Sequence, residues 1–198
     1  QGVVEVEAPG LRMRAPAVRV RGPRVLVAGP GAMTIDPEAN AGVEEQDVAS
    51  RPARTSAADA VEIHWDDRLD LALSDGEDRL RRARFEGGET GRVRVRSEAL
   101  ELEAGSLDVA FLEDGSVASG GDRIERIEAE GGVVALRPDG SARLDARTLT
   151  VDMRQDSDAA RPGRIEAEGE VRAFDAARVL WASALEVVLR SPGEADRA

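Results

Sequence analysis

The chain has 198 residues, of which 41% are hydrophobic and 33% charged, a balance typical of a globular protein and not of a disordered one. Its formal net charge is −12 and only 3% of its residues are aromatic, which together disfavour nucleic acids and anionic membrane surfaces as partners. All 27 basic residues are arginine. Cysteine is absent, which excludes disulfides, thiol chemistry and zinc sites with cysteine ligands.

The first 35 residues alternate between apolar and polar side chains, which is the pattern of half-buried strands. This alternation ends at the turn residues Gly29-Pro30-Gly31. Residues 36–60 have no sustained period and are rich in Asp, Glu, Ala and Pro, so we expect a loop or a disordered insert there. The alternating apolar residues are Val4, Val6, Leu11, Met13, Ala15, Val18, Val20, Val25 and Val27.

Strands resume at 61–65 and 69–73, and their apolar residues keep one parity, which predicts a continuous or tightly turned pair. Residues 154–163 predict another loop, and residues 191–198 a polar tail. We therefore expect a single domain over 1–198, and the chain has no apolar stretch of about 18 residues that would span a bilayer. Hairpin turns are predicted at the dipeptides Asp75-Gly76, Asp114-Gly115 and Asp139-Gly140.

An eight-residue pattern, [Leu/Met]-x-Ala-x-x-[Leu/Val]-x-Val, occurs four times, at 13–20, 102–109, 144–151 and 180–187. The last three copies start 42 and 36 residues apart, which indicates a fold of stacked units. Within each copy, the step from Ala to the second Leu or Val is three residues, which would reverse the buried face of a regular strand. We therefore predict a bulge or corner in every copy, where the strand bends and keeps its apolar set facing inward.

A second repeat precedes two of these copies, at 126–133 and 164–171. Ile, Ala, Gly and Val occupy alternate positions and Arg or Glu fill most of the others, which predicts a half-buried strand with a glycine at a kink or close backbone approach. The glutamates of this repeat are expected to face outward. Together the repeats predict an all-β, antiparallel protein built from strand, turn and bent strand.

Residues that would carry chemistry are scarce. His64 is the only histidine and lies between Ile63 and Trp65, on the opposite strand face, so we interpret it as a surface residue. Asp66 and Asp67 follow it, but one histidine and loop acids are a weak metal signal. Asp156-Ser157-Asp158 lacks the glycine and distal glutamate of a calcium loop and is interpreted as a solvated loop. We expect no catalytic residue, no metal, no cofactor and no enzymatic activity.

The order of the repeats, Ile-x-Ala-x-Gly-x-Val, a loop, then Leu-x-Ala-x-x-Leu-x-Val, resembles the OstA-like (LptA-like) β-jellyrolls of the lipopolysaccharide-transport system. The stretches 127–133 with 144–151, and 165–171 with 180–187, each look like one unit of that family. Trp65, Phe85-Glu86-Gly87 and 102–109 are similar to an earlier unit, and 25–35 to the strand that closes the first repeat. The likeness covers most of the chain except 36–60 and the tail.

The resemblance implies an open, V-shaped β-jellyroll of two sheets in the periplasm or cell envelope, although the chain as given shows no signal peptide. It implies an interior that shields lipid or lipopolysaccharide acyl chains, and sheet edges that pair with other β-jellyroll subunits. The recurring apolar positions are the candidate lipid-groove residues, and a closed core would have the same sequence pattern. These residues are Val18, Val20, Leu107, Val109, Leu149, Val151, Leu185 and Val187.

Two other functions remain open on the sequence. Exposed sheet edges would let such units add end to end, as in bactofilin-like filaments or scaffolds. A carbohydrate-binding sandwich ranks lower, because it favours exposed Trp or Tyr platforms and the chain has two tryptophans and no tyrosine.

Overall fold

The computed structural model describes residues 3–8, 11–35, 60–74, 80–98, 100–112, 124–155 and 160–189. The predicted insert 36–60, the tail 191–198, the turn signals Asp75-Gly76 and Asp114-Gly115 and the segment Asp156–Asp158 lie mostly or wholly outside these residues.

The described chain forms one 15-stranded sheet in which every pair of neighbouring strands is antiparallel, and it contains no helix. The predicted all-β, antiparallel class is therefore confirmed. The strands are β1 (Val4–Ala8), β2 (Leu11–Ala15), β3 (Val18–Arg21), β4 (Arg24–Ala28), β5 (Gly31–Ile35), β6 (Val61–Trp65), β7 (Arg68–Leu73), β8 (Leu80–Glu86), β9 (Val93–Arg96), β10 (Glu101–Ala104), β11 (Ser106–Phe111), β12 (Ile124–Leu136), β13 (Ala142–Gln155), β14 (Ala160–Asp175) and β15 (Val179–Val188).

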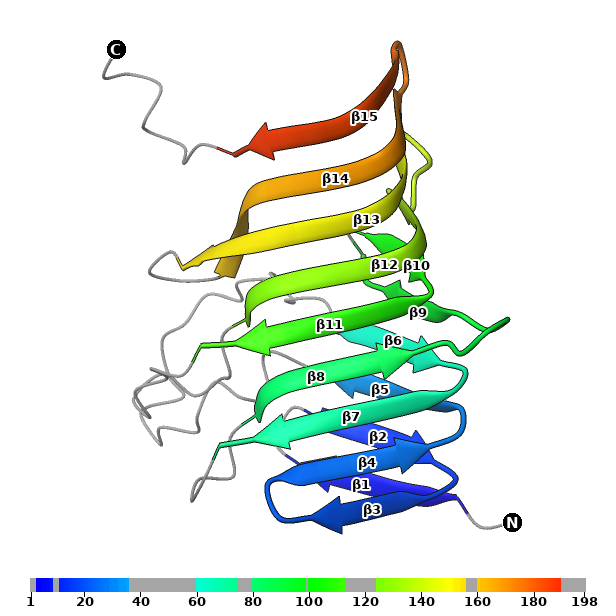
Figure 1. Cartoon of the computed structure of the whole chain (residues 1–198), viewed down its shortest axis with the longest axis vertical. Helices are drawn as coiled ribbons and strands as arrows, with labels where there is room; N and C mark the ends of the chain where they lie inside the picture. Colours follow the sequence, from blue (N-terminus) through cyan, green and yellow to red (C-terminus); the bar gives the residue numbers. More distant parts are fainter. Residues whose placement is uncertain are drawn as a thin grey trace, which may run out of the picture.

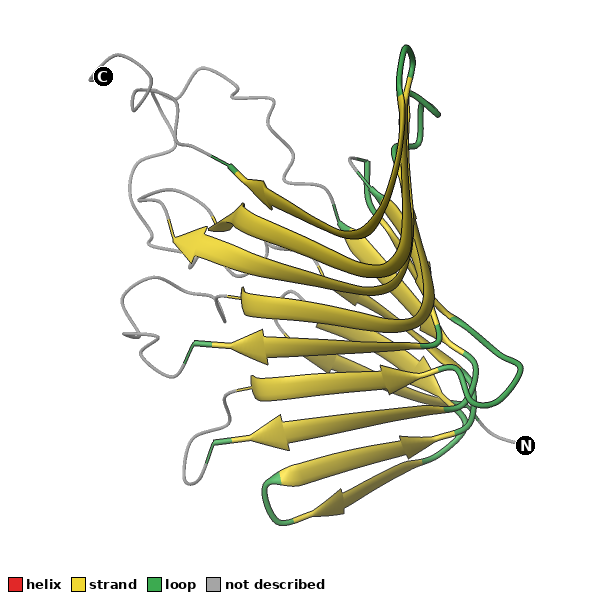
Figure 2. Ribbon diagram, turned by 45° about the horizontal axis from the view of Figure 1, so that its top comes forward, coloured by secondary structure: helices red, strands yellow, loops and turns green. Residues whose placement is uncertain are grey.

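The sheet folds over on itself so that two layers face each other (Figures 1 and 2). The first layer contains β1, β2, β5, β6, β9 and β10, and the second contains β3, β4, β7, β8 and β11. The long strands cross between the layers: β12 pairs with β10 through residues 134–136 and with β11 through residues 124–130. Because these strands join the two layers, the sheet nearly closes on itself.

The bend lies where the repeated pattern predicts it. On β13 the pairing with both neighbours shifts between Asp145 and Thr148, so Ala146 and Leu149 are both buried on the inner side despite their spacing of three. In the earlier copies the strand is interrupted at the same place, between β2 and β3 and between β10 and β11. The predicted bend is confirmed, and it keeps one apolar face inward around the corner.

The mid-strand glycines allow the corner to form. Gly131 and Gly132 have φ values of 87° and 77°, which L-residues rarely adopt, and they form the bulge on β12 opposite the bend of β13. A Cβ on Gly131 would lie 3.0 Å from the Cα of Gly105, so the backbones of two neighbouring strands meet there. This confirms the close backbone approach expected from the second repeat.

We expect Gly131→Ala to destabilise the fold by about 2–3 kcal/mol, because it adds both the left-handed backbone cost and a contact with a backbone that cannot move away freely. Gly140→Ala is the matched control: its φ is 70°, but a Cβ there would meet nothing within 4 Å, so we expect a loss of only about 1 kcal/mol. Urea unfolding of both variants measures the difference, and equal losses would contradict a steric role for Gly131.

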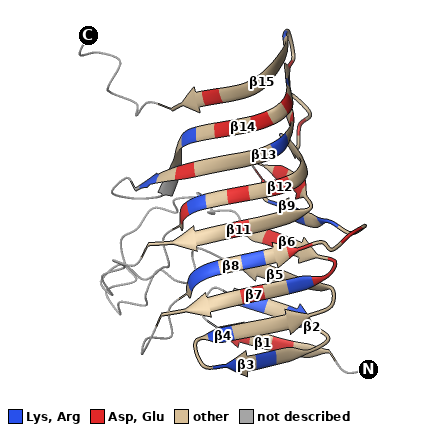
Figure 3. Ribbon diagram, viewed as in Figure 1, with Lys and Arg blue, Asp and Glu red and all other residues tan. Residues whose placement is uncertain are grey.

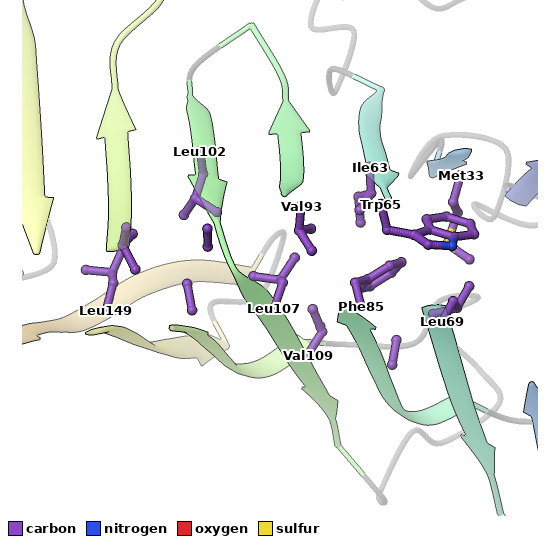
Figure 4. Packing of buried hydrophobic residues seen from close by; sticks show 14 of the residues in the cluster. Met33, Ile63, Trp65, Leu69, Phe85, Val93, Leu102, Leu107, Val109 and Leu149 are labelled. Carbon is purple, nitrogen blue, oxygen red and sulfur yellow. The ribbon is translucent and has the colours of Figure 1, made fainter. Parts of the chain in front are cut away.

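Apolar side chains fill the space between the layers (Figure 4). At the centre, the rings of Trp65 and Phe85 pack with their centroids 5.6 Å apart, and Trp65 donates a hydrogen bond of 3.0 Å from Nε1 to the carbonyl of Gly29. The described chain buries no polar or charged residue. The buried hydrophobic residues are Met13, Ala15, Val27, Met33, Ile63, Trp65, Leu69, Leu71, Ala83, Phe85, Val93, Leu102, Ala104, Leu107, Val109, Phe111, Ala129, Val133, Ala135, Ala146, Leu149, Ala167 and Val171.

Charged side chains occupy the outer face and pair across strands. Arg82 donates to Asp108 at 2.7 Å, and Arg126 donates to Asp152 at 2.7 Å. These hydrogen bonds raise the pKa of both arginines above the ordinary value, because each guanidinium is stabilised in its charged form. The alternation of arginine with acids in the sequence is therefore an outer-face pattern, and Figure 3 shows it as blue and red bands on the strands.

Candidate functional site

The second residue pair of each repeated motif forms two rows on the inner face of the second layer. Across β11 to β15, Leu107 faces Ala129, Ala129 faces Leu149, Leu149 faces Ala167, and Ala167 faces Leu185. Directly opposed residues on neighbouring strands point to the same side of a sheet. Leu107, Leu149 and Leu185, which are about 40 residues apart in sequence, therefore form a single line of side chains.

The neighbouring row is built the same way. Val109 faces Ile127, Ile127 faces Val151, Val151 faces Ile165, and Ile165 faces Val187. The two rows continue toward the N-terminus through β8, β7 and β4 and end on β3 at Val18 and Val20. All eight candidate lipid-groove residues thus lie on one inner face.

Burial changes along these rows. Leu107, Val109 and Leu149 belong to the packed core, so the interior is closed at the middle of the sheet. At the N-terminal edge, Val18 packs against the core but Val20 is 67% exposed. Both residues lie on β3, which is an edge strand of the described sheet.

At the C-terminal edge the rows become half-buried at Val151, Leu185 and Val187. The facing row of the first layer shows the same trend. Its members are cross-strand neighbours on successive strands, in the order Leu102, Ala135, Leu144, Ala173 and Leu180. Leu102 and Ala135 are buried, Leu144 and Ala173 are half-buried, and Leu180 is 44% exposed. Inner-face apolar side chains of both layers therefore reach solvent together on β13–β15.

The residues weighed above as catalytic or metal-binding candidates lie on the surface of the protein. His64 is half-exposed, and its Nε2 lies 3.8 Å from a carboxylate oxygen of Glu62. Asp66 accepts a hydrogen bond of 2.7 Å from the backbone N–H of Arg92 and lies 3.8 Å from the guanidinium of Arg94. The surface position predicted for His64 is confirmed. In the described ranges no group of three His, Asp or Glu residues is arranged to hold a metal ion.

A shallow depression lies on the outer face of the second layer, over Ala110. Arg82 and Arg126 flank it, and Asp108, Glu125 and Glu128 complete its lining. Since both arginines already donate to carboxylates and the acids outnumber them, the depression has neither a free cationic centre for an anion nor a nucleophile beside a base.

Sequence reasoning missed one exposed group, the start of β15. Val179, Leu180 and Trp181 are 47%, 44% and 67% exposed. The signal was present, because three consecutive apolar residues on a strand break the alternation expected of a half-buried strand. The repeated motif includes only Leu180 of this group among its fixed apolar positions.

No part of the described chain forms a helix that is long and apolar enough to cross a membrane. Comparison of the chain with models of protein families, with curated proteins and with solved structures gives no match.

Proposed function

We propose that this protein is a non-catalytic, OstA-like β-jellyroll of the periplasm or cell envelope that shields lipid acyl chains between its two layers. One observation carries the proposal. The apolar inner face is continuous from the closed centre to the C-terminal strands, where Leu144, Val151, Leu185 and Val187 remain half-buried and Leu180 is exposed. The sequence resemblance supplies the ligand class and the compartment.

The closed centre limits where a lipid fits. An acyl chain cannot enter beside Leu107 or Leu149 without displacing packed side chains, whereas at β13–β15 it would cover apolar surface that now faces water. Each methylene group of the acyl chain that is buried there contributes about 0.8 kcal/mol, so the burial of several methylene groups suffices for measurable binding. We therefore place the acyl contacts on β13–β15.

A photoreactive amino acid at position 187 tests the proposal. With purified lipopolysaccharide or phosphatidylethanolamine as the probe, we expect irradiation to form a lipid adduct, detected by mass spectrometry. The matched control is the same photoreactive residue at position 64, which lies half-exposed on the outer face and should form none. Absence of an adduct at 187, or equal adducts at both positions, would contradict a lipid-binding interior.

Leu185→Arg gives a second measurement at the same place. Because Leu185 is half-buried on an edge strand, we expect the long side chain to reach water and the fold to lose less than about 1.5 kcal/mol. The charged head would occupy the apolar surface, so adduct formation at position 187 should fall strongly. Unchanged adduct formation would contradict the assignment of this end as the lipid contact.

The free edges favour a second candidate function, a structural module that joins copies end to end. Of the described strands, β15 pairs only with β14, β3 only with β4 and β1 only with β2, so each of the three has an unpaired side. The edges differ in charge, since β3 carries Arg19 and Arg21 on its exposed positions and β15 carries Glu186. Native mass spectrometry separates the two functions: integer multiples of 21.1 kDa favour assembly, and added lipid mass on one copy favours shielding.

A further inference from the structure

The hairpin between β14 and β15 ends in an apolar tip. We define the β15 tip as residues 176–181, Ala-Ala-Arg-Val-Leu-Trp, all of which are exposed. Arg178 is its only charged residue. The hairpin is the uppermost feature in Figure 2, and Figure 3 shows β15 with a single acidic band, from Glu186.

The outer face of the tip differs from the outer face of β9 and β10 in the same layer. On β9 and β10 the outer positions are Arg94, Arg96, Glu101 and Glu103, whereas on β15 they are Val179 and Trp181. Phe174 lies directly opposite Val179 and adds a half-buried aromatic side chain to the same side. Leu180 is exposed on the inner side. The tip is therefore apolar on both faces.

The tip is also held in shape by its own hydrogen bonds. Asp175 accepts bonds of 2.8 Å from the backbone N–H groups of Ala177 and Arg178, and its own N–H donates to the carbonyl of Arg178 at 3.0 Å. The nearest acid is thus engaged with the backbone at the base of the tip. Arg172, opposite Trp181, is exposed and adds a second cation to this side.

We propose that the β15 tip docks into the headgroup region of a zwitterionic phospholipid bilayer. Tryptophan prefers this region because its ring is amphipathic, and Val179 and Leu180 would leave water on the apolar side of it. Arg178 and Arg172 match the lipid phosphates, which accept charge-assisted hydrogen bonds. The net charge of −12 disfavours a strongly anionic surface, which is why we assign a zwitterionic one.

A second copy of the chain fits the tip less well. Strand addition at the edge of β15 proceeds in the plane of the sheet and leaves the outer-face side chains Val179 and Trp181 facing solvent. A planar lipid surface covers both faces of a protruding tip together. The proposal goes beyond acyl-chain shielding and holds whether or not the interior binds lipid.

Vesicles of phosphatidylcholine, with and without bromine on the acyl chains, test the docking. The chain has two tryptophans, of which Trp65 is 1% exposed and Trp181 is 67% exposed. We expect brominated vesicles to quench the Trp181 part of the emission and leave the Trp65 part unchanged. Trp181→Ala should remove the quenched component and weaken co-flotation with vesicles roughly tenfold.

Val3→Ala is the matched control, because Val3 is 66% exposed, much as Trp181 is, but lies just before β1 at the other end of the sheet. It should float with vesicles like the unmodified protein, and circular dichroism should show both variants folded. The proposal fails if the unmodified protein does not bind vesicles, if both variants weaken binding equally, or if Trp181→Ala instead dissolves a dimer in lipid-free buffer. Adduct formation at position 187 is measured separately, so loss of docking and loss of acyl binding are distinguishable.

Discussion

Leu149→Arg is expected to unfold the protein or to lower its free energy of unfolding by at least about 4 kcal/mol. Leu149 is 5% exposed, and its cross-strand neighbours Ala129 and Ala167 are buried beside it in the core. The arginine head would therefore be buried without a partner, since the described interior contains no polar or charged side chain. The free energy of unfolding of a domain is typically about 5–15 kcal/mol, so a loss of this size removes a large fraction of it.

Two further variants show whether the loss of stability in Leu149→Arg comes from the buried position of the charge or from the change in side-chain size. Leu149→Met conserves volume and apolarity, so we expect a loss under about 1.5 kcal/mol. Leu185→Arg introduces the same charge into the same row but at the half-buried end, where the head reaches water. Thermal and urea unfolding of the three proteins measure the order. If Leu149→Arg were as stable as Leu185→Arg, the centre of the sheet would be open, and acyl chains would have access to the whole row.

Trp65→Ala should cost about 3–5 kcal/mol of stability. The indole is almost inaccessible, packs against Phe85 and donates its N–H to the carbonyl of Gly29, which would lose this bond. Gly31 lies beneath the ring: a Cβ at Gly31 would come within 2.3 Å of an indole carbon, so Gly31 has no side chain that could fill the space that the ring leaves. The cavity would remain open because the neighbouring strands are fixed by their pairing on both sides.

Trp181→Ala provides the control for this prediction. The same substitution at a side chain that is two thirds exposed should change the free energy of unfolding by less than about 0.5 kcal/mol. Urea unfolding followed by circular dichroism compares the two without relying on fluorescence, which both substitutions alter. Similar losses from Trp65→Ala and Trp181→Ala would mean that the tip, and not the Trp65–Phe85 pair, organises the interior.

The contrast between Leu149 and Leu185 bears on function. The two residues occupy the same position of the repeated motif, and their side chains lie in the same row. Only the number of strands beyond each one differs: β14 and β15 cover Leu149, while in the described chain no strand covers Leu185. The proposed lipid contact at β13–β15 thus follows from where the sheet ends, and an added copy at this edge would compete with lipid for the same apolar surface.

The strand class, the bends and the inward-facing apolar residues could all be predicted from the sequence alone. Alternation with period two predicted the strands, and the step of three between Ala146 and Leu149 required a corner, because a strand with one buried side cannot change faces. It also placed His64 on the surface. These features depend on neighbours along one strand, so local spacing is sufficient to predict them.

Which inner-face residues are closed core and which are open could not be predicted from the sequence, because it depends on the pairing of the strands. The sequence assigned Leu107, Leu149 and Leu185 the same environment, since their local patterns are identical, whereas burial depends on the strands paired on either side. The exposed tip at Val179–Trp181 was missed for the same reason: an apolar run predicts burial unless the strand is known to lie at an edge. Strand order, and hence the position of the edge, is set by pairings between distant segments, and no window of local sequence contains that information.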